Sequence, residues 1–576
     1  MTATPVNTPI TPVLTSSLSC GTTDVPLIEQ TLGDFFDAMV ERLPDHEALV
    51  SVHQQLRYTY RELQTASKQL ASALLGLGLE PGDRVGIWSH NNAQWLLMQL
   101  ATAQVGLILV NINPAYRVAE LEYALNKVGC KALVTMARFK SSDYLGMVRE
   151  LAPELDTATA GALQAARLPQ LRTVVWLDEP GQADEAPGLM RFSSLLAAGD
   201  AADPRLAAVA RLLHATDPIN IQFTSGTTGS PKGATLTHRN IVNNAISVAA
   251  AMRFGAGDRL CVPVPLYHCF GMVMSSLACA VTGGTMVFPG EGFDAAAALA
   301  AVEEERCTHL HGVPTMFIAE LDAPQFAATE LGSLRGGIMA GSPCPIEVMK
   351  RVNAEMHMTE VTIAYGMTET SPVSFQSSVD DPVERRVSTV GRIQPHLEVK
   401  IVDGGGNTVE VGEKGELLTR GYSVMLGYWG DEDRTRETVR GGWMHTGDLA
   451  TIDAQGYCNI VGRVKDMLIR GGENVYPREI EEFLFGHPKV SQVQVFGVPD
   501  ARFGEEVCAW VVLKPGEQAT EDEIRGWCRE RIAHYKVPRY VRFVQELPMT
   551  VTGKAQKFVM REKMMSELGL AEQKNA

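Results

Sequence analysis

The sequence lacks the features of a secreted, zinc-binding or membrane-embedded protein. Its ten cysteines include no C-x-x-C pair, so neither a zinc site nor a disulfide framework is indicated. No stretch approaches the run of about 18 apolar residues that a membrane-spanning helix requires. Basic residues are also in short supply, since 51 Lys and Arg face 67 Asp and Glu, which leaves a net charge of −16. This charge argues against a general nucleic-acid or membrane-surface binder.

The N-terminal segment has no targeting pattern. Residues 1 to 23 carry no charged side chain and are rich in Thr, Ser and Pro. A secretory signal needs a basic start and a continuous apolar core, and a mitochondrial presequence needs arginines. We therefore expect a disordered tail over residues 1 to 30 and a protein located in the cytoplasm, where cysteines stay reduced.

Helix and strand patterns alternate over most of the chain. Helical spacing of apolar residues at 61 to 75 and 94 to 104 alternates with short apolar runs at 85 to 88 and 107 to 110. Five further strands follow between residues 259 and 364. Such alternation is typical of parallel sheets with crossover helices. We expect an α/β fold whose large N-terminal domain, residues 31 to 464, contains two doubly wound subdomains. The Ala-, Gly-, Pro- and Asp-rich residues 157 to 208 are expected to form a surface excursion.

The pattern changes near residue 390. Short strands separated by Gly and Asp turns predict a small β-barrel-like subdomain. Residues 465 to 576 then contain a helix that begins at Pro477, strands at 490 to 498 and 507 to 513, and a helix that begins at Thr520, with Glu523 in the position of a capping box. They predict a separate small α+β domain.

A glycine- and hydroxyl-rich stretch occupies residues 224 to 233, Thr-Ser-Gly-Thr-Thr-Gly-Ser-Pro-Lys-Gly. Glycines let backbone N–H groups converge on one point, the hydroxyls add neutral donors, and Lys232 adds a positive charge. This combination suits the oxygens of a polyphosphate. A flexible linker is the alternative, but a linker rarely lies between a buried strand ending at Phe223 and a helix capped by Thr237.

The stretch differs from a Walker-type phosphate loop. Pro231 stands where the second glycine would be, and Gly233 replaces the Ser or Thr that would hold Mg²⁺. The metal ligand must therefore come from elsewhere. Glu369, in a Tyr-Gly-Met-Thr-Glu-Thr run directly after a predicted strand, is a candidate, because ligands bind beyond the carboxyl ends of strands in open α/β sheets.

Three other residues suit nucleotide chemistry. Tyr365 offers an aromatic face for a purine, and Asp448, in His-Thr-Gly-Asp, would accept hydrogen bonds from ribose hydroxyls. Lys554 follows Thr-Gly near the C-terminus, on a turn from which it would project from one domain into another.

Together these motifs resemble the adenylate-forming family, which includes acyl-CoA synthetases, luciferases and peptide-synthetase adenylation domains. The stretches that carry the resemblance are residues 224–233, 365–369, 443–448, 462–473 and 548–554. The resemblance covers essentially the whole chain after about Thr31, and the chain is most similar to medium-chain fatty acyl-CoA ligases.

The resemblance implies a two-step reaction with ATP, Mg²⁺ and coenzyme A. A fatty acid attacks the α-phosphorus of ATP to give acyl-AMP and pyrophosphate, and CoA then takes the acyl group after a mobile C-terminal domain has rotated. Lys465 matches the hinge. Phosphate-binding positions are implied at Thr224, Ser225, Gly226, Thr227, Thr228, Gly229 and Lys232. The remaining first-step roles are Mg²⁺ at Glu369, the α-phosphate at Thr368, ribose at Asp448 and Arg463, and a bridge between carboxylate and α-phosphate at Lys554.

For the second step, the resemblance implies that the rotated domain presents Gly471, Gly472 and Glu473 beside a tunnel for the CoA thiol. Tyr535 would stack on the CoA adenine, and Lys536 or Arg539 would pair with a phosphate. Val537 stands where some relatives carry a basic residue, which is a departure from the family pattern.

Residues 267 to 272 match the acyl-pocket motif of the family, so the resemblance places the acyl substrate near them. His268 is either a core histidine or a gate residue, and we count it among the catalytic candidates. Residues 271 to 280 contain no acid, so the ammonium of an amino acid would be buried unpaired. A fatty acid is favoured; the alternatives are an aryl-CoA ligase, a luciferase-like oxygenase and an acyl-AMP-forming relative with a non-CoA acceptor. We expect small-molecule partners, no nucleic acid and no membrane span, and we hypothesise a homodimer.

Overall fold

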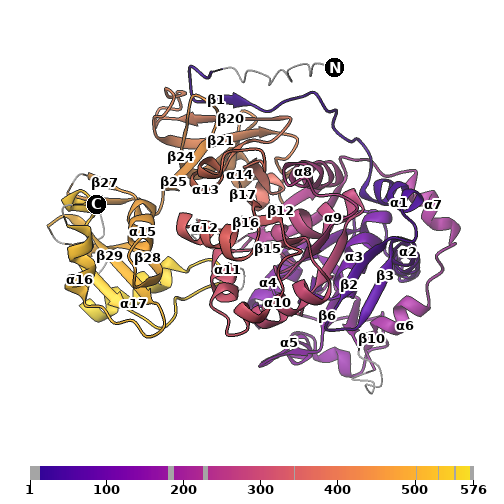
Figure 1. Ribbon diagram of the computed structural model, residues 1–576. Helices are drawn as coiled ribbons and strands as arrows, with labels where there is room; N and C mark the ends of the chain where they lie inside the picture. The colour runs from indigo at the N-terminus through magenta and orange to yellow at the C-terminus, as the bar shows by residue number, and fades with distance from the viewer. Residues whose placement is uncertain are drawn as a thin grey trace, which may run out of the picture.

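The computed structural model describes residues 13–178, 187–224, 231–342, 344–471, 473–500, 502–529, 531–550 and 553–570. Two large α/β sheets, a six-stranded sheet and a five-stranded C-terminal sheet account for most of its strands (Figure 1). The expected α/β fold class is confirmed.

The first α/β sheet has eight strands in the order β10-β9-β6-β4-β5-β11-β12-β22. Strands β10 to β11 along this order are parallel, and the last two are antiparallel additions. The strands are β4 (Arg84–Trp88), β5 (Ile108–Asn111), β6 (Cys130–Met136), β9 (Thr173–Leu177), β10 (Leu189–Arg191), β11 (Pro218–Thr224), β12 (Lys232–Thr237) and β22 (Gly427–Tyr428).

The second α/β sheet has nine strands in the order β19-β18-β17-β16-β15-β13-β14-β2-β3, with a parallel centre from β17 to β2. The strands are β2 (Glu47–Ser51), β3 (Leu56–Thr59), β13 (Arg259–Cys261), β14 (Thr285–Phe288), β15 (His309–Gly312), β16 (Gly336–Ala340), β17 (Glu360–Gly366), β18 (Val373–Gln376) and β19 (Arg392–Ile393). The central strands are buried on both faces, as parallel strands between helical layers are.

Helices separate and cover the two sheets in layers. The largest hydrophobic core lies between the sheets and includes residues of α1 (Leu32–Arg42), α2 (Tyr60–Gly76), α3 (Ala93–Gln104), α8 (His238–Ala251), the π-helix η2 (Phe270–Leu277) and α9 (Ala278–Thr282). The outer face of the first sheet packs on α4 (Val118–Val128) and α5 (Tyr144–Leu151). The second packs on α10 (Ala295–Glu304), α11 (Pro314–Leu321) and α12 (Ile346–Glu355).

The six-stranded sheet corrects the prediction of a disordered tail over residues 1 to 30. In the described part of that segment, β1 (Leu18–Cys20) pairs with the edge of β20 (Leu397–Val402), and Ser17 is fully buried. The composition of the segment did not reveal this strand, because its pairing partner lies almost 400 residues away. The other strands are β21 (Gly415–Gly421), β23 (Val439–Arg440), β24 (Trp443–Ile452) and β25 (Cys458–Arg463).

The predicted surface excursion at 157 to 208 is also wrong in part. Its residues 173–177 form β9, a buried inner strand of the first sheet. The run Thr-Val-Val-Trp-Leu is short and apolar, and the small polar residues around it dominated the composition. The helix η1 (Pro153–Asp156) precedes this range, and α6 (Phe192–Ala197) and α7 (Pro204–Ala210) follow β9.

The C-terminal unit has its own sheet and its own core. The strands are β26 (Leu468–Arg470), β27 (Glu473–Val475), β28 (Val490–Asp500), β29 (Gly504–Leu513) and β30 (Tyr540–Phe543), and the helices are α15 (Pro477–Phe485), α16 (Glu521–Cys528) and α17 (Lys557–Leu568). Lys465 lies in the turn between β25 and β26, where the chain leaves one sheet for another. The unit lies beside α12. Its helix α15 is on the side that faces the rest of the molecule (Figure 1).

Candidate active site

The phosphate-loop stretch joins two antiparallel strands rather than a strand and a helix; the two strands and their connection are called the phosphate hairpin. β11 ends at Thr224, and Lys232 begins the antiparallel strand β12. Helix α8 follows β12, with the Thr237 hydroxyl accepting from the Asn240 N–H at 3.1 Å as predicted for its cap. Five predicted phosphate-binding residues, Ser225, Gly226, Thr227, Thr228 and Gly229, lie outside the described residues.

Glu369 lies next to this hairpin. It belongs to the short helix η4 (Thr368–Thr370), which follows β17, and it is only 5% exposed. The Thr224 hydroxyl donates to Glu369 Oε1 at 3.2 Å, and the Tyr428 hydroxyl donates to the same oxygen at 2.9 Å. Lys232 Nζ lies 4.6 Å from the centroid of the Tyr428 ring.

Tyr428 is the residue at this place that sequence reasoning missed. It lies on β22, which adds to β12 at the end of the first sheet. A Gly-Tyr-Trp run between two turn-rich segments is the only signal that would have drawn attention to it. Only the sheet pairing brings this tyrosine, almost 200 residues beyond Lys232, to the phosphate hairpin.

A second group surrounds Asp448. The Tyr365 hydroxyl donates to Asp448 Oδ2 at 2.5 Å, and Arg463 Nε donates to Asp448 Oδ1 at 3.1 Å. Asp448 and Arg463 lie opposite each other in the β24–β25 ladder, so their separation is fixed by the backbone. Burial, then the charge of Asp448, raises the pKa of Tyr365, which therefore remains a neutral donor.

Lys554 reaches the same site from the C-terminal unit. Its turn closes on Thr550, which accepts from the Gly553 N–H at 2.9 Å and donates its own N–H to the Lys554 carbonyl at 2.8 Å. The Lys554 side chain keeps accessible surface, yet desolvation in the site lowers its pKa. The charge of Arg463 acts in the same direction, whereas the nearby carboxylates of Glu369 and Asp448 oppose it.

His268 lies near Lys554 but cannot act as a cation at neutral pH. Burial, with the Lys554 charge as a smaller cause, lowers the pKa of His268 to about 3. Its Nδ1 accepts from the Phe270 N–H at 3.2 Å, so the ring helps to shape the start of η2. Next to it, burial raises the pKa of Cys269 to about 12, and the thiol donates to Gln222 Oε1 at 3.0 Å. Thr368 also contacts this thiol.

The second-step candidates lie apart from these groups. The Gly471 N–H donates to the Phe503 carbonyl within the C-terminal unit, and Arg539 pairs with Asp500 at 3.0 Å and Glu506 at 3.4 Å. The Tyr535 ring packs against the core of that unit. Gly472 lies outside the described residues.

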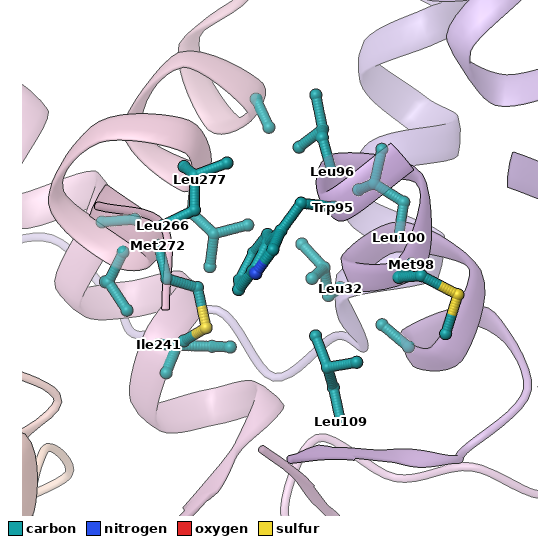
Figure 2. Close-up of a cluster of buried hydrophobic side chains, with 14 of the residues drawn as sticks. Leu32, Trp95, Leu96, Met98, Leu100, Leu109, Ile241, Leu266, Met272 and Leu277 are labelled. Carbon is teal, nitrogen blue, oxygen red and sulfur yellow. The ribbon is translucent and has the colours of Figure 1, made fainter. Parts of the chain in front are cut away.

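The acyl-pocket motif leads into an apolar region between the two sheets. All eight residues of η2 are buried, and π-helical turns are rare and frequent at functional sites. The Trp95 indole of α3 points between Leu266, Met272 and Leu277 on one side and Leu32 and Leu109 on the other (Figure 2). Its Nε1 is buried without a hydrogen-bond partner in the described part of the chain.

The described residues contain no cluster of three or more His, Cys, Asp or Glu that would hold a metal by themselves. A single carboxylate such as that of Glu369 is enough for an ion that takes its other ligands from substrate and water, as Mg²⁺ does. None of the helices in the described ranges is both long and apolar enough to cross a bilayer.

Comparisons with known proteins also indicate a nucleotide-binding enzyme. The model of the AMP-binding enzyme family matches residues 36–429, and that of the AMP-binding enzyme C-terminal domain matches residues 479–554. The mitochondrial medium-chain acyl-CoA ligase ACSF2 of Danio rerio is 48% identical over 98% of this chain and 93% of its own length.

Two solved structures have the same fold. The anthranilate CoA ligase AuaEII in complex with anthranoyl-AMP has a TM-score of 0.84 at 27% identity, over 95% of this chain and 99% of that one. ATP-bound MatB from Rhodopseudomonas palustris has a TM-score of 0.80 at 29% identity, over 93% and 99%.

The prediction of a cytoplasmic location is contradicted, because the Danio rerio relative and its mammalian counterparts are named as mitochondrial. Location is decided by address signals that receptors read, and the arginine content of one segment is an incomplete test of such a signal. The resemblance itself is confirmed: the family model covers more than half of the chain, and this chain belongs to the AMP-binding enzyme family.

Proposed function

We propose that this chain is an AMP-forming ligase that activates a medium-chain fatty acid with ATP and transfers it to coenzyme A. The observation that carries the proposal is the convergence of Lys554 with Glu369, Asp448 and Arg463, which come from distant parts of the chain. Adenylation needs a cation where two anions meet, and these residues supply it beside candidate ribose- and metal-binding groups.

In the first step, the fatty carboxylate approaches the α-phosphorus of ATP. Both groups are negative, so a fixed positive charge between them stabilises the transition state more than the separated reactants. Lys554 supplies this charge, and the Thr368 hydroxyl donates to the α-phosphate. Asp448 and Arg463 hold the ribose, while Lys232 and Thr224 bind the outgoing phosphates.

Mg²⁺ would be held by Glu369, with phosphate oxygens and water completing its shell. When bound, the ion neutralises charge that develops on the departing phosphates. The buried carboxylate, fixed by two hydroxyl donors, supports this assignment.

The second step requires a different arrangement of the chain. We infer a domain boundary at residues 464 and 465, with Lys465 as the hinge, and a rotation that carries Gly471, Gly472 and Glu473 to the acyl group. Tyr535 and Lys536 or Arg539 would then contact CoA. Arg539 must exchange its ion pairs with Asp500 and Glu506 for a phosphate. A homodimer remains a hypothesis.

An apolar substrate suits the region around η2. The segment from Phe270 to Leu277 is buried, and residues 271 to 280 contain no acid to pair with an ammonium. The relatives named as medium-chain acyl-CoA ligases support a fatty acid of intermediate length.

The test is ATP–pyrophosphate exchange, followed by acyl-CoA formation, with acids from acetate to palmitate, benzoate and phenylalanine. Each buried methylene contributes about 0.8 kcal/mol, so kcat/KM should rise by roughly two orders of magnitude from butyrate to octanoate and then level or fall. A higher kcat/KM for benzoate or phenylalanine than for octanoate would refute the substrate assignment. Exchange without any acyl-CoA would indicate a non-CoA acceptor, and oxygen uptake with a luciferin would indicate an oxygenase.

A further inference from the structure

We propose that Tyr428 is a positioning residue, which orients the Glu369 carboxylate toward Mg²⁺ and supports Lys232 of the phosphate hairpin on its ring. The inference rests on the proposed ATP-dependent function. It gives a role to a residue that lies outside all five stretches on which the sequence resemblance depends.

The hydroxyl contact fixes one oxygen of Glu369. Tyr428 and Thr224 both donate to Oε1, and no hydrogen bond to Oε2 comes from any residue that the structure describes. Two donors on one oxygen set the plane of the carboxylate and leave Oε2 to a cation. Hydrogen bonds of this kind fix the orientation of a metal-binding side chain.

The ring of Tyr428 holds the charged ammonium of Lys232 in place. Lys232 Nζ lies 4.6 Å from the ring centroid, within the range where the negative face of an aromatic ring attracts an ammonium. One side chain therefore contacts both the metal-binding acid and the phosphate-binding cation.

The backbone around Tyr428 is held in the same way. Tyr428 pairs with Ala234 across β22 and β12, and its N–H donates to the Thr435 hydroxyl of α14 (Glu432–Thr438) at 2.9 Å. Nearby, the Met425 N–H donates to the Glu369 carbonyl at 3.0 Å. The strand that carries Lys232 and the turn that carries Glu369 are thus both tied to the segment that carries Tyr428.

The first test uses Tyr428→Phe, which removes the hydroxyl and keeps the ring. Calorimetry measures ATP binding to the full chain without fatty acid, once with Mg²⁺ and once with EDTA. We expect Mg²⁺-dependent ATP affinity to fall roughly 10–100-fold, as it does when partners of metal ligands are removed, while metal-free ATP affinity stays at the wild-type value. An unchanged affinity for ATP with Mg²⁺, or an equal fall under both conditions, would overturn the assignment of the hydroxyl.

The ring is tested with Tyr428→Leu. Because Lys232 then loses its support, metal-free ATP affinity should fall below that of Tyr428→Phe. Equal metal-free affinities of the Leu and Phe variants would overturn the role of the ring.

Tyr457→Phe is the matched control. The Tyr457 hydroxyl donates to Asp381 Oδ1 at 2.7 Å, and the Arg392 guanidinium lies 4.2 Å from the Tyr457 ring centroid. The control variant therefore also loses a tyrosine–carboxylate hydrogen bond and keeps a ring beside a cation, but in another part of the molecule. Its Mg²⁺ dependence should match the wild type; a loss as large as that of Tyr428→Phe would mean that general destabilisation is the cause.

A separate measurement tests the proposed function independently of the role of Tyr428. Octanoyl-CoA formation by the wild-type chain tests the proposed function, and its absence would refute that function. A wild type that makes octanoyl-CoA, beside a Tyr428→Phe variant with normal Mg²⁺ dependence, would refute only the role of Tyr428.

Discussion

Lys554 and Glu320 illustrate, at the scale of single residues, how burial decides what an ionisable group does. Lys554 is desolvated, which lowers its pKa, but it faces the carboxylates of Glu369 and Asp448. Glu320 of α11 is 1% exposed, and neither of its carboxyl oxygens has a hydrogen-bond partner among the described residues. Burial raises the pKa of Glu320 well above its ordinary value, so this acid keeps its proton.

Lys554→Ala should abolish adenylation but largely spare thioester formation from preformed acyl-AMP. The charge is needed only while carboxylate and phosphate approach, and loss of such an oriented group typically costs about 2.7–4 kcal/mol of barrier. Separate assays of pyrophosphate exchange and of acyl-AMP consumption by CoA measure the two steps. Equal losses in both would refute the proposed role.

Glu320→Gln should remove a pH-dependent component of stability. In the unfolded chain Glu320 ionises near its ordinary pKa of about 4.3, whereas the folded protein retains the proton. Its contribution is therefore fully present below that pH and is lost, at about 1.4 kcal/mol per pH unit, as pH rises toward the raised folded pKa.

Denaturant unfolding at several pH values above about 5 measures this effect. The Gln variant, which cannot ionise, should gain stability relative to the wild type with each step in pH. The exposed Glu304→Gln on α10 is the control and should run parallel to the wild type. A constant difference between Glu320→Gln and the wild type over the whole range would contradict the prediction.

Among the elements, the turn that carries Lys554 packs closely against a distant part of the chain. Gly553 has φ +75°, and a Cβ there would lie 2.6 Å from Val313 Cγ2 and 3.1 Å from Thr315 Oγ1, at the start of α11. Only glycine allows the turn to approach the start of α11 this closely. The position of Lys554 thus depends on the close approach of the Gly553 backbone to the side chains of Val313 and Thr315.

Gly553→Ala should therefore displace the lysine and slow adenylation. A misplacement of about 1 Å can cost roughly 100-fold in rate, and we expect a loss of that order, with the thioester step retained. Gly516→Ala is a matched control, because Gly516 has φ +81° and a Cβ there would meet no atom of the described residues within 4 Å. It introduces a similar backbone strain of about 1–2 kcal/mol without a clash. If both variants slow adenylation equally, strain rather than the contact is responsible.

On the scale of the whole molecule, the two steps place different demands on one chain. The residues proposed for the first step converge, whereas the second-step candidates Gly471, Tyr535 and Arg539 make their contacts within the C-terminal unit. The connection between the six-stranded sheet and the C-terminal sheet is the short turn from β25 to β26. In this turn the Val464 N–H donates to the Gly447 carbonyl, and the N–H groups of Asp466 and Met467 donate to the Arg463 carbonyl. A change of backbone angles in this turn would reorient the whole C-terminal unit.

Lys465→Pro should slow thioester formation far more than adenylation. Proline fixes φ and removes an N–H donor, so a position that must change its backbone angle no longer does so. Lys465→Ala keeps the backbone free and should retain both rates. Single-turnover measurements of each step decide the matter, and a normal rate of acyl-CoA formation by the Pro variant would refute the hinge.

The sequence by itself determined the fold class and the identity of most first-step candidates. Strand β14 coincides with the mainly apolar run at 285 to 288, and β20 coincides with the alternating run Leu-Glu-Val-Lys-Ile-Val at 397 to 402, because such local patterns reflect which side chains are buried. Thr237 caps α8 because its hydroxyl bonds within its own turn. The motifs around Glu369, Asp448 and Lys554 were visible as short runs of residues whose chemistry does not depend on their neighbours in space.

Only the tertiary structure determined the features that depend on contacts between segments far apart in the sequence. β1 and β9 are strands because free edges of other strands meet them, which no composition reveals. Tyr428 reaches Glu369 and Lys232 only through the pairing of β22 with β12. Asp448 meets Arg463 through the pairing of β24 with β25, and the fold brings Tyr365 of β17 to the same carboxylate. Local patterns encode which residues are buried and which turn, but the free energy of a contact between remote segments depends on the whole arrangement of the chain.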